Sequence, residues 1–482
     1  MNKTIRHTAV ICLALVFALL VRATWVQAFE AKALADDTYN RRTAIARYAH
    51  PLGDIIVAGS PVTGSRRTEG GDLAYERTYK DGALYAPVTG YSSQAFGATQ
   101  LEGIYADVLD GTDSRLQNPL DALMGKEAAP GDVLTTIDPD VQRAGYAALG
   151  SAKGAAVAID PKTGRVLAVV STPSYDPARI SGAGDGAAWK ELTGDAEKPM
   201  VNRALRQPLP PGSTFKLVVA AAALEDGLYG SVDEATESPD PYTLPTTSTV
   251  LRNESASAPC ANASIRTALR YSCNTVFAKM ADDLGQRKVR AMAERFGFDD
   301  SAQDMPVRAS ASVYPSGMDR AQTALSGIGQ YDVTATPLQM AMVSAALAND
   351  GLSAAPHMVS KVVDANGDTV QSYPDGDTTR IVSADTARQL RSAMVTVVED
   401  GTGTNAKIDG AEVGGKTGTA QHGVANSRTP YAWFTSYAKD ASSGKEVAVA
   451  VVVEDSGAAR SEVSGNGLAA PIAQKMMKAA LK

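Results

Sequence analysis

The segment that decides the fold runs from Pro210 to Ala220 and reads PPGSTFKLVVA. Its prolines and glycine favour a loop, and the apolar run that follows favours a helix beginning at Ser213. Ser213 and Lys216 are three residues apart, so they lie on one face of that helix. The segment therefore predicts a serine hydroxyl beside a lysine amine at the start of a helix.

This pair has the chemistry of a nucleophile and its base. A serine hydroxyl is a weak nucleophile that needs a base in contact with it, and the free N–H groups of a helix N-terminus can stabilise a developing oxyanion. The pattern Ser-x-x-Lys also occurs from Ser442 to Lys445, but that copy lies in a turn expected between two strands. The candidate nucleophile and base are therefore Ser213 and Lys216.

Two further motifs occur twice each, and their context selects one copy of each. Ser272-Cys-Asn274 falls within a helical stretch expected over 264–283, whereas Ser464-Gly-Asn466 falls in a loop rich in Gly and Ser. Lys416-Thr-Gly-Thr419 leads toward an expected strand, whereas Lys162-Thr-Gly164 has the composition of a hairpin turn. The candidate site therefore contains Ser213, Lys216, Ser272, Asn274, Lys416, Thr417 and Gly418.

The segments around this site predict one α/β domain. Strands are expected over 154–159, 166–171, 431–437 and 446–453. Helices are expected over 213–226, 264–283, 284–296, 337–349 and 470–481. Because strands lie at both ends with helices between them, the sheet must be assembled from distant segments.

The chain before this domain has a different composition, and we expect the joint between Gly125 and Gly131. Residues 30–130 are rich in Tyr, Gly and Thr with short apolar runs, which indicates a small strand-rich module. We call residues 30–130 the amino-terminal module and residues 131–482 the carboxy-terminal domain.

The first thirty residues have the pattern of a membrane signal. Residues 1–7 carry positive charge, and residues 8–29 form an apolar segment about long enough to cross a bilayer. We favour an uncleaved single-pass anchor, which places residues 30–482 on the extracytoplasmic side of the cell membrane. A cleaved signal peptide, with Val26-Gln-Ala28 as its cleavage site, is the alternative.

The composition excludes several classes of protein. Of the 482 residues, 44% are apolar and 21% are charged, which is typical of a globular chain. The net charge is −7 with no long basic block, so we expect no nucleic-acid partner. Four His and three Cys without the spacing of a metal site indicate no metal and no cofactor.

The three motifs, in this order, resemble the signature of penicillin-binding proteins and class A β-lactamases. The chain resembles a class B penicillin-binding protein over nearly all of its length after residue 131. The segments 85–90 and 40–42 are most similar to the actinobacterial branch of that family, penicillin-binding protein A. Other segments that look familial are 136–138, 158–164, 173–177, 202–204, 329–330, 336–340 and 401–403.

This resemblance implies both a fold and a reaction. The fold is the penicillin-binding and serine β-lactamase-like transpeptidase domain, a mainly antiparallel sheet flanked by helices with an all-helical subdomain. The reaction is that of a peptidoglycan D,D-transpeptidase, in which Ser213 attacks the bond between the two terminal D-alanines of a stem peptide. An amine of a neighbouring stem resolves the acyl-enzyme, and β-lactams acylate the same serine and inhibit the enzyme.

The resemblance also implies how the proton and the charges are handled. Neutral Lys216 would deprotonate Ser213, and burial together with the charge of Lys416 would lower the pKa of Lys216. Ser272 would relay a proton to the leaving amine, and Asn274 would hydrogen-bond a substrate amide.

Substrate recognition is assigned to the third motif. Lys416 would attract the terminal carboxylate of the substrate, and the hydroxyls of Thr417 and Thr419 would hydrogen-bond it. The backbone N–H groups of Ser213 and Thr419 would form the oxyanion hole.

Cys260 and Cys273 are the two cysteines of the exported part. Outside the membrane such a pair favours a disulfide, and the loop 255–262 can bring Cys260 to the helix that carries Cys273. The bond would fix the Ser272 and Asn274 wall of the cleft. Two buried thiols are the alternative.

The amino-terminal module departs from the family at one place. Many members begin it with Arg-Gly-x-Ile, whereas this chain reads Leu52-Gly-Asp-Ile55, so a salt bridge of that arginine is missing or replaced. The module also lacks the length of a glycosyltransferase domain. The resemblance therefore implies a separate partner for glycan polymerisation, a SEDS-family membrane glycosyltransferase.

Other functions share part of this pattern. A D,D-carboxypeptidase uses the same motifs with water in place of the amine, and it is the closest alternative. The intact set Ser213, Lys216 and Lys416 argues against a catalytically idle β-lactam-binding scaffold. A β-lactamase gains nothing from a membrane anchor, and a β-lactam sensor needs more membrane spans. We therefore expect a transpeptidase.

Overall fold

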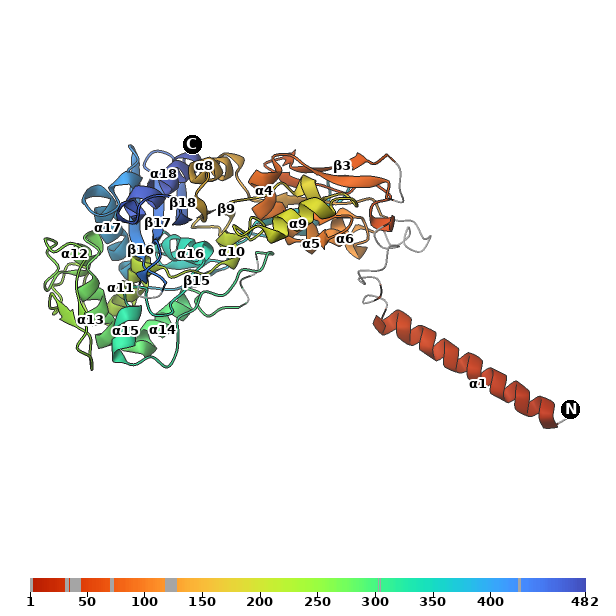
Figure 1. Cartoon of the computed structure of the whole chain (residues 1–482), viewed down its shortest axis with the longest axis horizontal. Helices are drawn as coiled ribbons and strands as arrows, with labels where there is room; N and C mark the ends of the chain where they lie inside the picture. Colours follow the sequence, from red (N-terminus) through yellow and green to blue (C-terminus); the bar gives the residue numbers. More distant parts are fainter. Residues whose placement is uncertain are drawn as a thin grey trace.

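The computed structural model describes residues 3–30, 34, 45–69, 73–117, 128–301, 303, 305–423 and 426–482. Residues 40–42 and residues 125–127 of the expected joint lie outside the described residues. Figure 1 shows the carboxy-terminal domain on the left, the amino-terminal module on the right, and helix α1 (Lys3–Trp25) apart from both. A π-helical turn, η1 (Val26–Glu30), continues α1.

Helix α1 has the properties of a membrane-spanning segment. None of its residues is buried against the rest of the chain. Among the described residues, 3–30 form the one helix that is long and apolar enough to cross a membrane. This helix contains the whole apolar segment predicted over residues 8–29.

The carboxy-terminal domain is built on a five-stranded sheet in the order β16-β17-β18-β8-β9, with every neighbouring pair antiparallel. Its strands are β16 (Ala411–Ala420), β17 (Tyr431–Asp440), β18 (Glu446–Asp455), β8 (Lys153–Ile159) and β9 (Val166–Thr172). The predicted hairpin is β8 and β9, and it joins the two predicted later strands through β18. The predicted antiparallel sheet from distant segments is therefore present.

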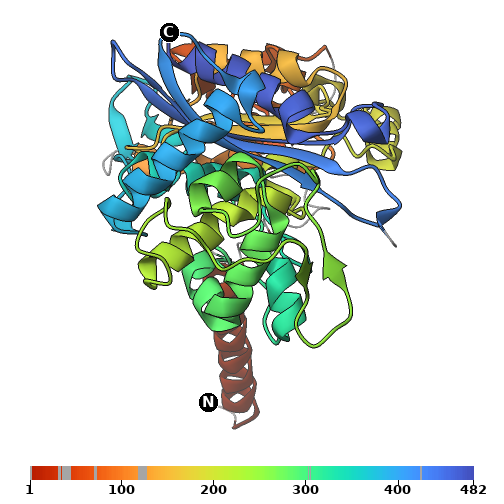
Figure 2. The ribbon, with the colours of Figure 1, turned by 90° about the vertical axis from the view of Figure 1, so that its left-hand side faces the viewer.

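Strand β18 explains why this sheet lies in the middle of the domain. Its residues are apolar in nearly every position, and alternate side chains point to opposite faces of the sheet. Val449 and Val451 belong to one core with α8 (Pro139–Leu149) and α18 (Ala470–Ala480). Ala450 and Val452 belong to the larger core on the other face. Figure 2 shows α8 in orange and α18 in dark blue above the strands, with the green helices below.

The second face of the sheet carries the helical subdomain. Its helices are α11 (Lys216–Glu225), α12 (Ile265–Arg270), α13 (Asn274–Leu284), α14 (Gln286–Arg295), α15 (Arg320–Ser326), α16 (Pro337–Ala348) and α17 (Ala384–Asp400). Helix α16 packs against β8, β17 and β18, so it lies directly on the sheet. The predicted helical subdomain is present, with one short hairpin of β10 (Tyr242–Thr243) and β11 (Val250–Leu251), and α17 is a helix that the sequence analysis did not identify.

Two predicted helices differ in detail from the structure. Ser213 lies in a 3₁₀ turn, η4 (Gly212–Phe215), and the α-helix begins only at Lys216. The predicted helix over 264–283 is interrupted between α12 and α13, because Ser272 has a left-handed φ of 57° that a continuous α-helix does not allow. Both differences concern residues of the candidate site.

The amino-terminal module is a mixed structure rather than a purely strand-rich one. It contains the hairpins β3 (Thr63–Arg67) with β4 (Tyr75–Tyr79) and β5 (Ser92–Ser93) with β6 (Gly97–Ala98). Its helices are α4 (Gly82–Thr89), α5 (Gln100–Ile104) and α6 (Ala106–Leu109). Tyr91 and Phe96 pack with Trp189 of α9 (Gly186–Gly194), which belongs to the carboxy-terminal domain by sequence.

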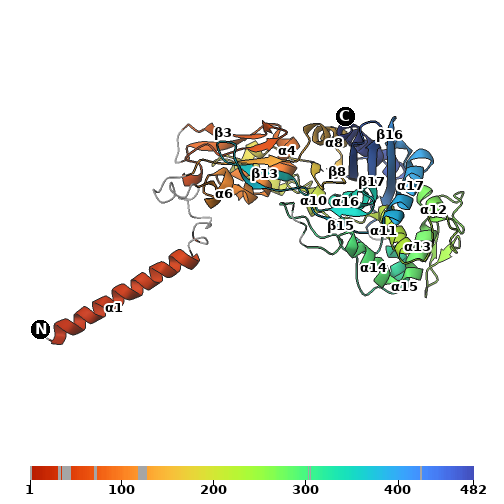
Figure 3. The same cartoon turned by 180° about the vertical axis from the view of Figure 1, so that it is seen from behind.

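A second sheet joins the module to the rest of the chain. Its order is β14-β13-β7-β1-β2, with the strands β14 (Thr369–Ser372), β13 (Val359–Val363), β7 (Asp132–Thr135), β1 (Ile55–Val57) and β2 (Ser60–Pro61). Figure 3 shows β13 beside the module, although its residues come late in the sequence. Backbone hydrogen bonds therefore tie β1 of the module to β7, and through β7 to β13 and β14.

A buried ion cluster fills the module near the stretch that departs from the family. The guanidinium of Arg77 is fully buried and donates from Nε to Glu102 Oε1 at 2.7 Å. It also lies 3.4 Å from Asp54 Oδ1 and donates to Thr63 Oγ1 at 2.9 Å. Leu52, at the position of the family arginine, is buried with an apolar side chain.

Candidate active site

Ser213 is held at the sheet by a tight turn that requires glycine. Gly212 has a φ of +53°, and its N–H donates to the carbonyl of Gly329 at 3.1 Å. A Cβ at Gly329 would lie 2.0 Å from the carbonyl oxygen of Gly212, so only glycine allows this approach. Thr214 Oγ1 donates to the Pro211 carbonyl at 2.7 Å and closes the turn. The serine therefore sits on a rigid turn at the edge of the sheet.

The third motif lies inside strand β16, not before a strand as the sequence indicated. Its ten residues pair without interruption with β17, and Lys416 is opposite Thr435. A Cβ at Gly418 would lie 2.9 Å from the carbonyl oxygen of Pro211, which shows how closely β16 approaches the turn η4. The glycines before Lys416 made this strand difficult to predict from the sequence, because glycine is rare in strand interiors.

The second motif lies in the break between α12 and α13. Lys216 Nζ donates to the Ser272 carbonyl at 2.8 Å, to Ser272 Oγ at 3.3 Å and to Asn274 Oδ1 at 2.8 Å. The left-handed φ of Ser272 turns both its carbonyl and its hydroxyl toward the lysine. The break in the helix is therefore what brings the second motif to the first.

Lys416 reaches the same serine from the sheet. Its Nζ donates to Ser272 Oγ at 2.9 Å and to the Thr417 carbonyl at 2.9 Å. Lys216 and Lys416 therefore share Ser272 Oγ as a hydrogen-bond acceptor. The side chain of Thr417 is 2.8 Å from Thr402 Oγ1. Three motifs from separate parts of the sequence meet at one hydroxyl group.

Both lysines are fully buried, and this changes their protonation. Burial is the main cause that lowers the pKa of Lys216 well below its usual value, and the charge of Lys416 lowers it further. Burial lowers the pKa of Lys416 to about 7. Glu254 opposes both shifts, because its carboxylate favours the charged amines. The pKa values of both lysines are therefore lowered toward the physiological range, and the charge of Lys416 favours the neutral form of Lys216.

Ser213 faces a cavity of about 460 Å³ together with Asn274 and Thr419. Within the part of the chain that the structure describes, its hydroxyl makes no hydrogen bond; the expected contact with Lys216 is replaced by the bonds of that lysine to Ser272 and Asn274. The cavity is also lined by Leu251, Arg252, Asn253, Glu254, Leu325, Ile328, Gln330, Tyr331, Gln421 and Asn426. Ser213 is thus open to a ligand.

Asn253 positions the second motif and was missed by the sequence analysis. Its Oδ1 accepts from the backbone N–H of Asn274 at 2.6 Å and of Thr275 at 3.1 Å, and its Nδ2 donates to Thr275 Oγ1 at 3.0 Å. Asn253 therefore caps α13 from a segment about twenty residues away. The sequence rule for helix caps considers only the residue just before the helix, so it does not predict a cap from a distant segment.

Cys260 and Cys273 are joined by a disulfide, with Cα atoms 5.6 Å apart. Both cysteines are buried. Cys273 lies between Ser272 and Asn274, so the bond attaches the second motif to the loop before α12.

Comparisons with known proteins agree with this geometry. Residues 154–478 match the family described as the penicillin binding protein transpeptidase domain, and residues 52–133 match the penicillin binding protein A dimerisation domain. The chain is 36% identical over 496 residues to the peptidoglycan D,D-transpeptidase PbpA of Mycolicibacterium smegmatis, covering 100% of this chain and 99% of that protein. It is 35% identical to PbpA of Mycobacterium tuberculosis with the same coverage.

Solved structures lead to the same group of proteins. Penicillin-binding protein A of M. tuberculosis, as a ceftriaxone acyl-enzyme complex, superposes with a TM-score of 0.84 at 34% identity and covers 91% of this chain and 100% of that one. The penicillin G acyl-enzyme complex of that protein superposes with a TM-score of 0.82 at 34% identity, covering 90% of this chain and 100% of that one.

Proposed function

The chain belongs to the penicillin-binding protein transpeptidase family, and from this premise we propose that Ser213 is the nucleophile of a peptidoglycan D,D-transpeptidase. One observation carries the proposal: two buried lysines share the hydroxyl of Ser272 beside the cavity that Ser213 faces. A buried lysine without a paired carboxylate is costly unless its pKa falls, and a lysine with a lowered pKa can act as a base.

Acylation begins with the transfer of the Ser213 proton to neutral Lys216. The Ser213 oxygen forms a bond with the carbonyl carbon between the two terminal D-alanines of the stem peptide. The oxyanion that develops is stabilised by the backbone N–H groups of Ser213 and Thr419. Lys216 must turn from its partners toward Ser213, and catalytic hydrogen bonds are commonly formed only with substrate present.

Collapse of the tetrahedral intermediate breaks the C–N bond. The proton passes from Lys216 through the Ser272 hydroxyl to the leaving nitrogen, and D-alanine departs as a free amine. Both lysines already donate to Ser272 Oγ, which supports this route. The amine of a second stem peptide then attacks the ester, forms the cross-link and returns the proton to Ser213.

Recognition of the substrate falls to β16 and α13. The positive charge of Lys416 attracts the terminal carboxylate, and the hydroxyls of Thr417 and Thr419 hydrogen-bond it. Gly418 lets β16 approach the turn of Ser213, and Asn274 binds a substrate amide. β-Lactams resemble the terminal dipeptide, so they acylate Ser213 and inhibit the enzyme.

The test is intact-mass spectrometry of the full chain in detergent after addition of benzylpenicillin, followed over hours. We expect one stable adduct on the wild type and none on Ser213→Ala. An adduct that persists on Ser213→Ala would refute the assignment of the nucleophile. Incubation with a stem pentapeptide and an amine acceptor then separates the reactions: a cross-linked dimer supports the transpeptidase, and free D-alanine without dimer indicates a carboxypeptidase.

We also propose the arrangement of the protein at the membrane. Residues 1–7 face the cytoplasm, residues 8–29 form a single-pass anchor, the module spans 30–130 and the transpeptidase domain spans 131–482. The apolar length of α1 and the basic residues at its start support this topology. Protease protection of right-side-out membrane vesicles tests it, since only the outer residues are digested.

A partner for glycan polymerisation follows from the family. We propose a SEDS-family membrane glycosyltransferase, which would supply the uncross-linked glycan strands. Co-purification of the tagged full chain with such a polymerase from cross-linked membranes tests this partner. A variant without residues 1–29 should lose the partner if the contact is made within the membrane.

A further inference from the structure

The cavity that Ser213 faces has one acidic residue in its lining. Glu254 is the only Asp or Glu among the described residues that line this cavity, and Arg252 is the only other charged residue. Within the part of the chain that the structure describes, neither Glu254 nor Arg252 forms an ion pair. A carboxylate without a partner at a cavity can accept hydrogen bonds from a cationic group of a ligand.

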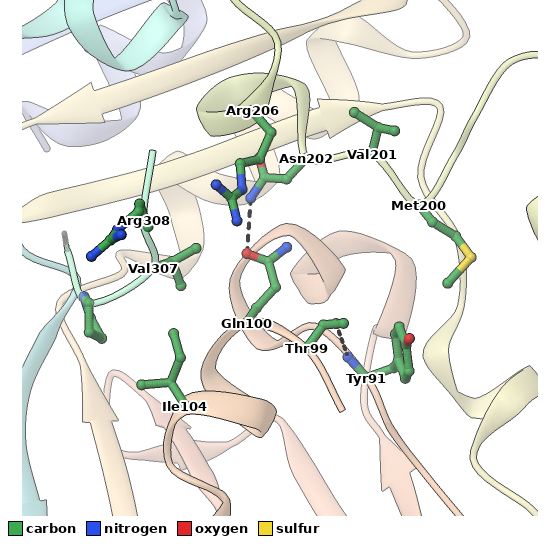
Figure 4. Close-up of a pocket in the computed structure, with 11 residues that line it drawn as sticks. Tyr91, Thr99, Gln100, Ile104, Met200, Val201, Asn202, Arg206, Val307 and Arg308 are labelled. Carbon is green, nitrogen blue, oxygen red and sulfur yellow. Dashed lines mark hydrogen bonds between the residues drawn. The ribbon is translucent and has the colours of Figure 1, made fainter. Parts of the chain in front are cut away.

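A larger cavity of the protein has the opposite charge. It has a volume of about 660 Å³ and lies between the amino-terminal module and the carboxy-terminal domain. Its charged residues are Arg206 and Arg308, and no Asp or Glu is among the described residues that line it. Figure 4 shows Arg206 in this cavity beside Asn202 and Gln100, whose side-chain amides are hydrogen-bonded to each other. A cationic ligand therefore suits the cavity of Ser213 better than this one.

The backbone of Glu254 is held next to the second motif. Its neighbour Asn253 caps α13 by accepting from the backbone N–H groups of Asn274 and Thr275. The loop that follows Glu254 is attached to the second motif by the disulfide. The side chain of Glu254 is itself exposed, and it makes no hydrogen bond to any residue that the structure describes. The fold therefore places this carboxylate at the cavity without using it as a structural contact.

The carboxylate of Glu254 acts against acylation in two ways. It raises the pKa of Lys216 and of Lys416, whereas burial lowers both pKa values. It thus disfavours the neutral form of Lys216 that the proposed base requires. It also repels the terminal carboxylate of the peptide that acylates Ser213. A carboxylate that hinders the first half of the reaction is better explained by a role in the second half.

The second half of the reaction brings in a ligand of opposite charge. An aliphatic amine is mostly protonated at neutral pH, so the acceptor peptide arrives as an ammonium ion. Its nitrogen must reach the ester carbon on Ser213 through the same cavity. We propose that Glu254 binds the ammonium group of the acceptor peptide and holds it beside the acylated serine. This inference rests on the transpeptidase function proposed above and assigns a binding residue to its second substrate.

The transfer that follows accounts for every proton. The ammonium group gives one proton to water as it leaves Glu254, and the neutral nitrogen attacks the ester carbon. A C–N bond forms, and the bond between that carbon and the Ser213 oxygen breaks. The second proton of the nitrogen passes through the Ser272 hydroxyl to the Ser213 oxygen. Glu254 binds the acceptor in this sequence and keeps its own charge throughout.

The test is a competition between two acceptors for one acyl-enzyme, with the full chain in detergent. The donor is a stem pentapeptide whose own amine is acetylated. One acceptor is a stem tetrapeptide with a free amine, which is charged at neutral pH, and the other is hydroxylamine, which is uncharged. Mass spectrometry measures the ratio of cross-linked dimer to hydroxamate. Because both products form from the same acyl-enzyme, this ratio does not depend on the rate of acylation.

Glu254→Gln should lower the ratio of dimer to hydroxamate about five- to tenfold, because only the charged acceptor uses the carboxylate. Glu254→Asp keeps the charge on a shorter side chain and should give an intermediate ratio. The matched control is Glu237→Gln, which removes an exposed carboxylate outside the cavity and should leave the ratio unchanged. A ratio for Glu254→Gln within about twofold of wild type, or equal falls in Glu254→Gln and Glu254→Asp, would overturn the proposal.

The same reactions separate a failure of this inference from a failure of the proposed function. Wild type that releases no D-alanine and forms no adduct with benzylpenicillin would refute the transpeptidase, and the acceptor site with it. Wild type that forms hydroxamate but no dimer would refute the acceptor site and leave acylation of Ser213 in place. A dimer that forms equally well in Glu254→Gln would refute the role of Glu254 alone.

Discussion

Arg77 in the amino-terminal module and Lys216 in the carboxy-terminal domain are both cations with 0% exposure, yet their surroundings are opposite. Arg77 contacts the carboxylates of Glu102 and Asp54, and Glu102 raises its pKa in spite of burial. Lys216 contacts a carbonyl, a hydroxyl and an amide, with a second buried lysine nearby. The first cation is stabilised as a charge, and the second is driven toward its neutral form.

The difference teaches what burial does to a cation in this protein. With a buried carboxylate as partner, the cation holds two segments together and keeps its proton. Without one, the cost of burial is relieved by loss of the proton, and a base results. A structural cation and the proposed base are therefore distinguished by their partners, and the following experiments test that distinction.

The largest effect is expected for Lys216→Met, which removes the base and keeps an apolar side chain of similar length. The rate of acylation by benzylpenicillin should fall by about 10³ to 10⁴. The measurement is the time course of the adduct by intact mass spectrometry. Arg77→Met should acylate at nearly the wild-type rate when it is folded, and a rate for Lys216→Met within about tenfold of wild type would contradict the role of the base.

The next effect concerns stability, and here the substitution of Arg77 should have a larger effect than the substitution of Lys216. Arg77→Met leaves Glu102 buried without its partner and should lower the free energy of unfolding by about 3–5 kcal/mol. The double variant Arg77→Met with Glu102→Met should recover part of this loss. Lys216→Met should cost less than Arg77→Met, because it leaves neutral acceptors and no carboxylate without a partner. Urea unfolding of the detergent-solubilised chain measures all three, and equal losses at Arg77 and Lys216 would remove the distinction.

The disulfide attaches the second motif to the loop before α12. It closes a short loop, with a sequence separation of 13, so removing it in Cys260→Ala with Cys273→Ala should lower the free energy of unfolding by about 2–3 kcal/mol. Acylation should slow much less than in Lys216→Met. The control is the wild type unfolded in dithiothreitol, which should match the double variant; a difference between them would point to side-chain packing rather than the bond.

The smallest effect is a pH dependence of acylation. The rate should rise with pH as Lys216 loses its proton, since only the neutral amine is a base. It should fall by about tenfold per unit above a pH near 7, where Lys416 loses the charge that attracts the substrate carboxylate. Lys416→Arg keeps its charge, so its falling limb should move to higher pH. An unchanged falling limb in Lys416→Arg would assign that limb to another group.

Much of the site could be predicted because its motifs are local. Ser213 and Lys216 are three residues apart, and this spacing predicts a serine nucleophile beside a lysine base. The strand that carries Lys416 was harder to identify, because Gly414 and Gly415 lower its strand propensity. Those glycines are required by the packing of Tyr437 and Phe434, whose rings would lie 2.3 and 2.4 Å from a Cβ at these two positions. These two rings belong to the neighbouring strand β17, so the sequence of β16 alone does not show why glycine is needed there.

The structure of the amino-terminal module was the least predictable part. Its sheet is completed by β13 and β14, and its aromatic cluster by Trp189, all from the carboxy-terminal domain. No local pattern in residues 30–130 indicates these partners. The pairing of Arg77 with Glu102 is equally hidden, because the two residues are 25 positions apart and on different elements.

The sequence by itself determined the three candidate motifs, the two-part organisation and the apolar segment at the start, because these depend on residue type and on contacts between near neighbours. Only the tertiary structure decided which polar groups are buried together. It placed two lysines on one serine hydroxyl, where loss of water lowers their pKa, and it surrounded one arginine with carboxylates, where the charge is kept. The physical reason is that desolvation and pairing are properties of a position in space, which distant segments create only when the chain has folded.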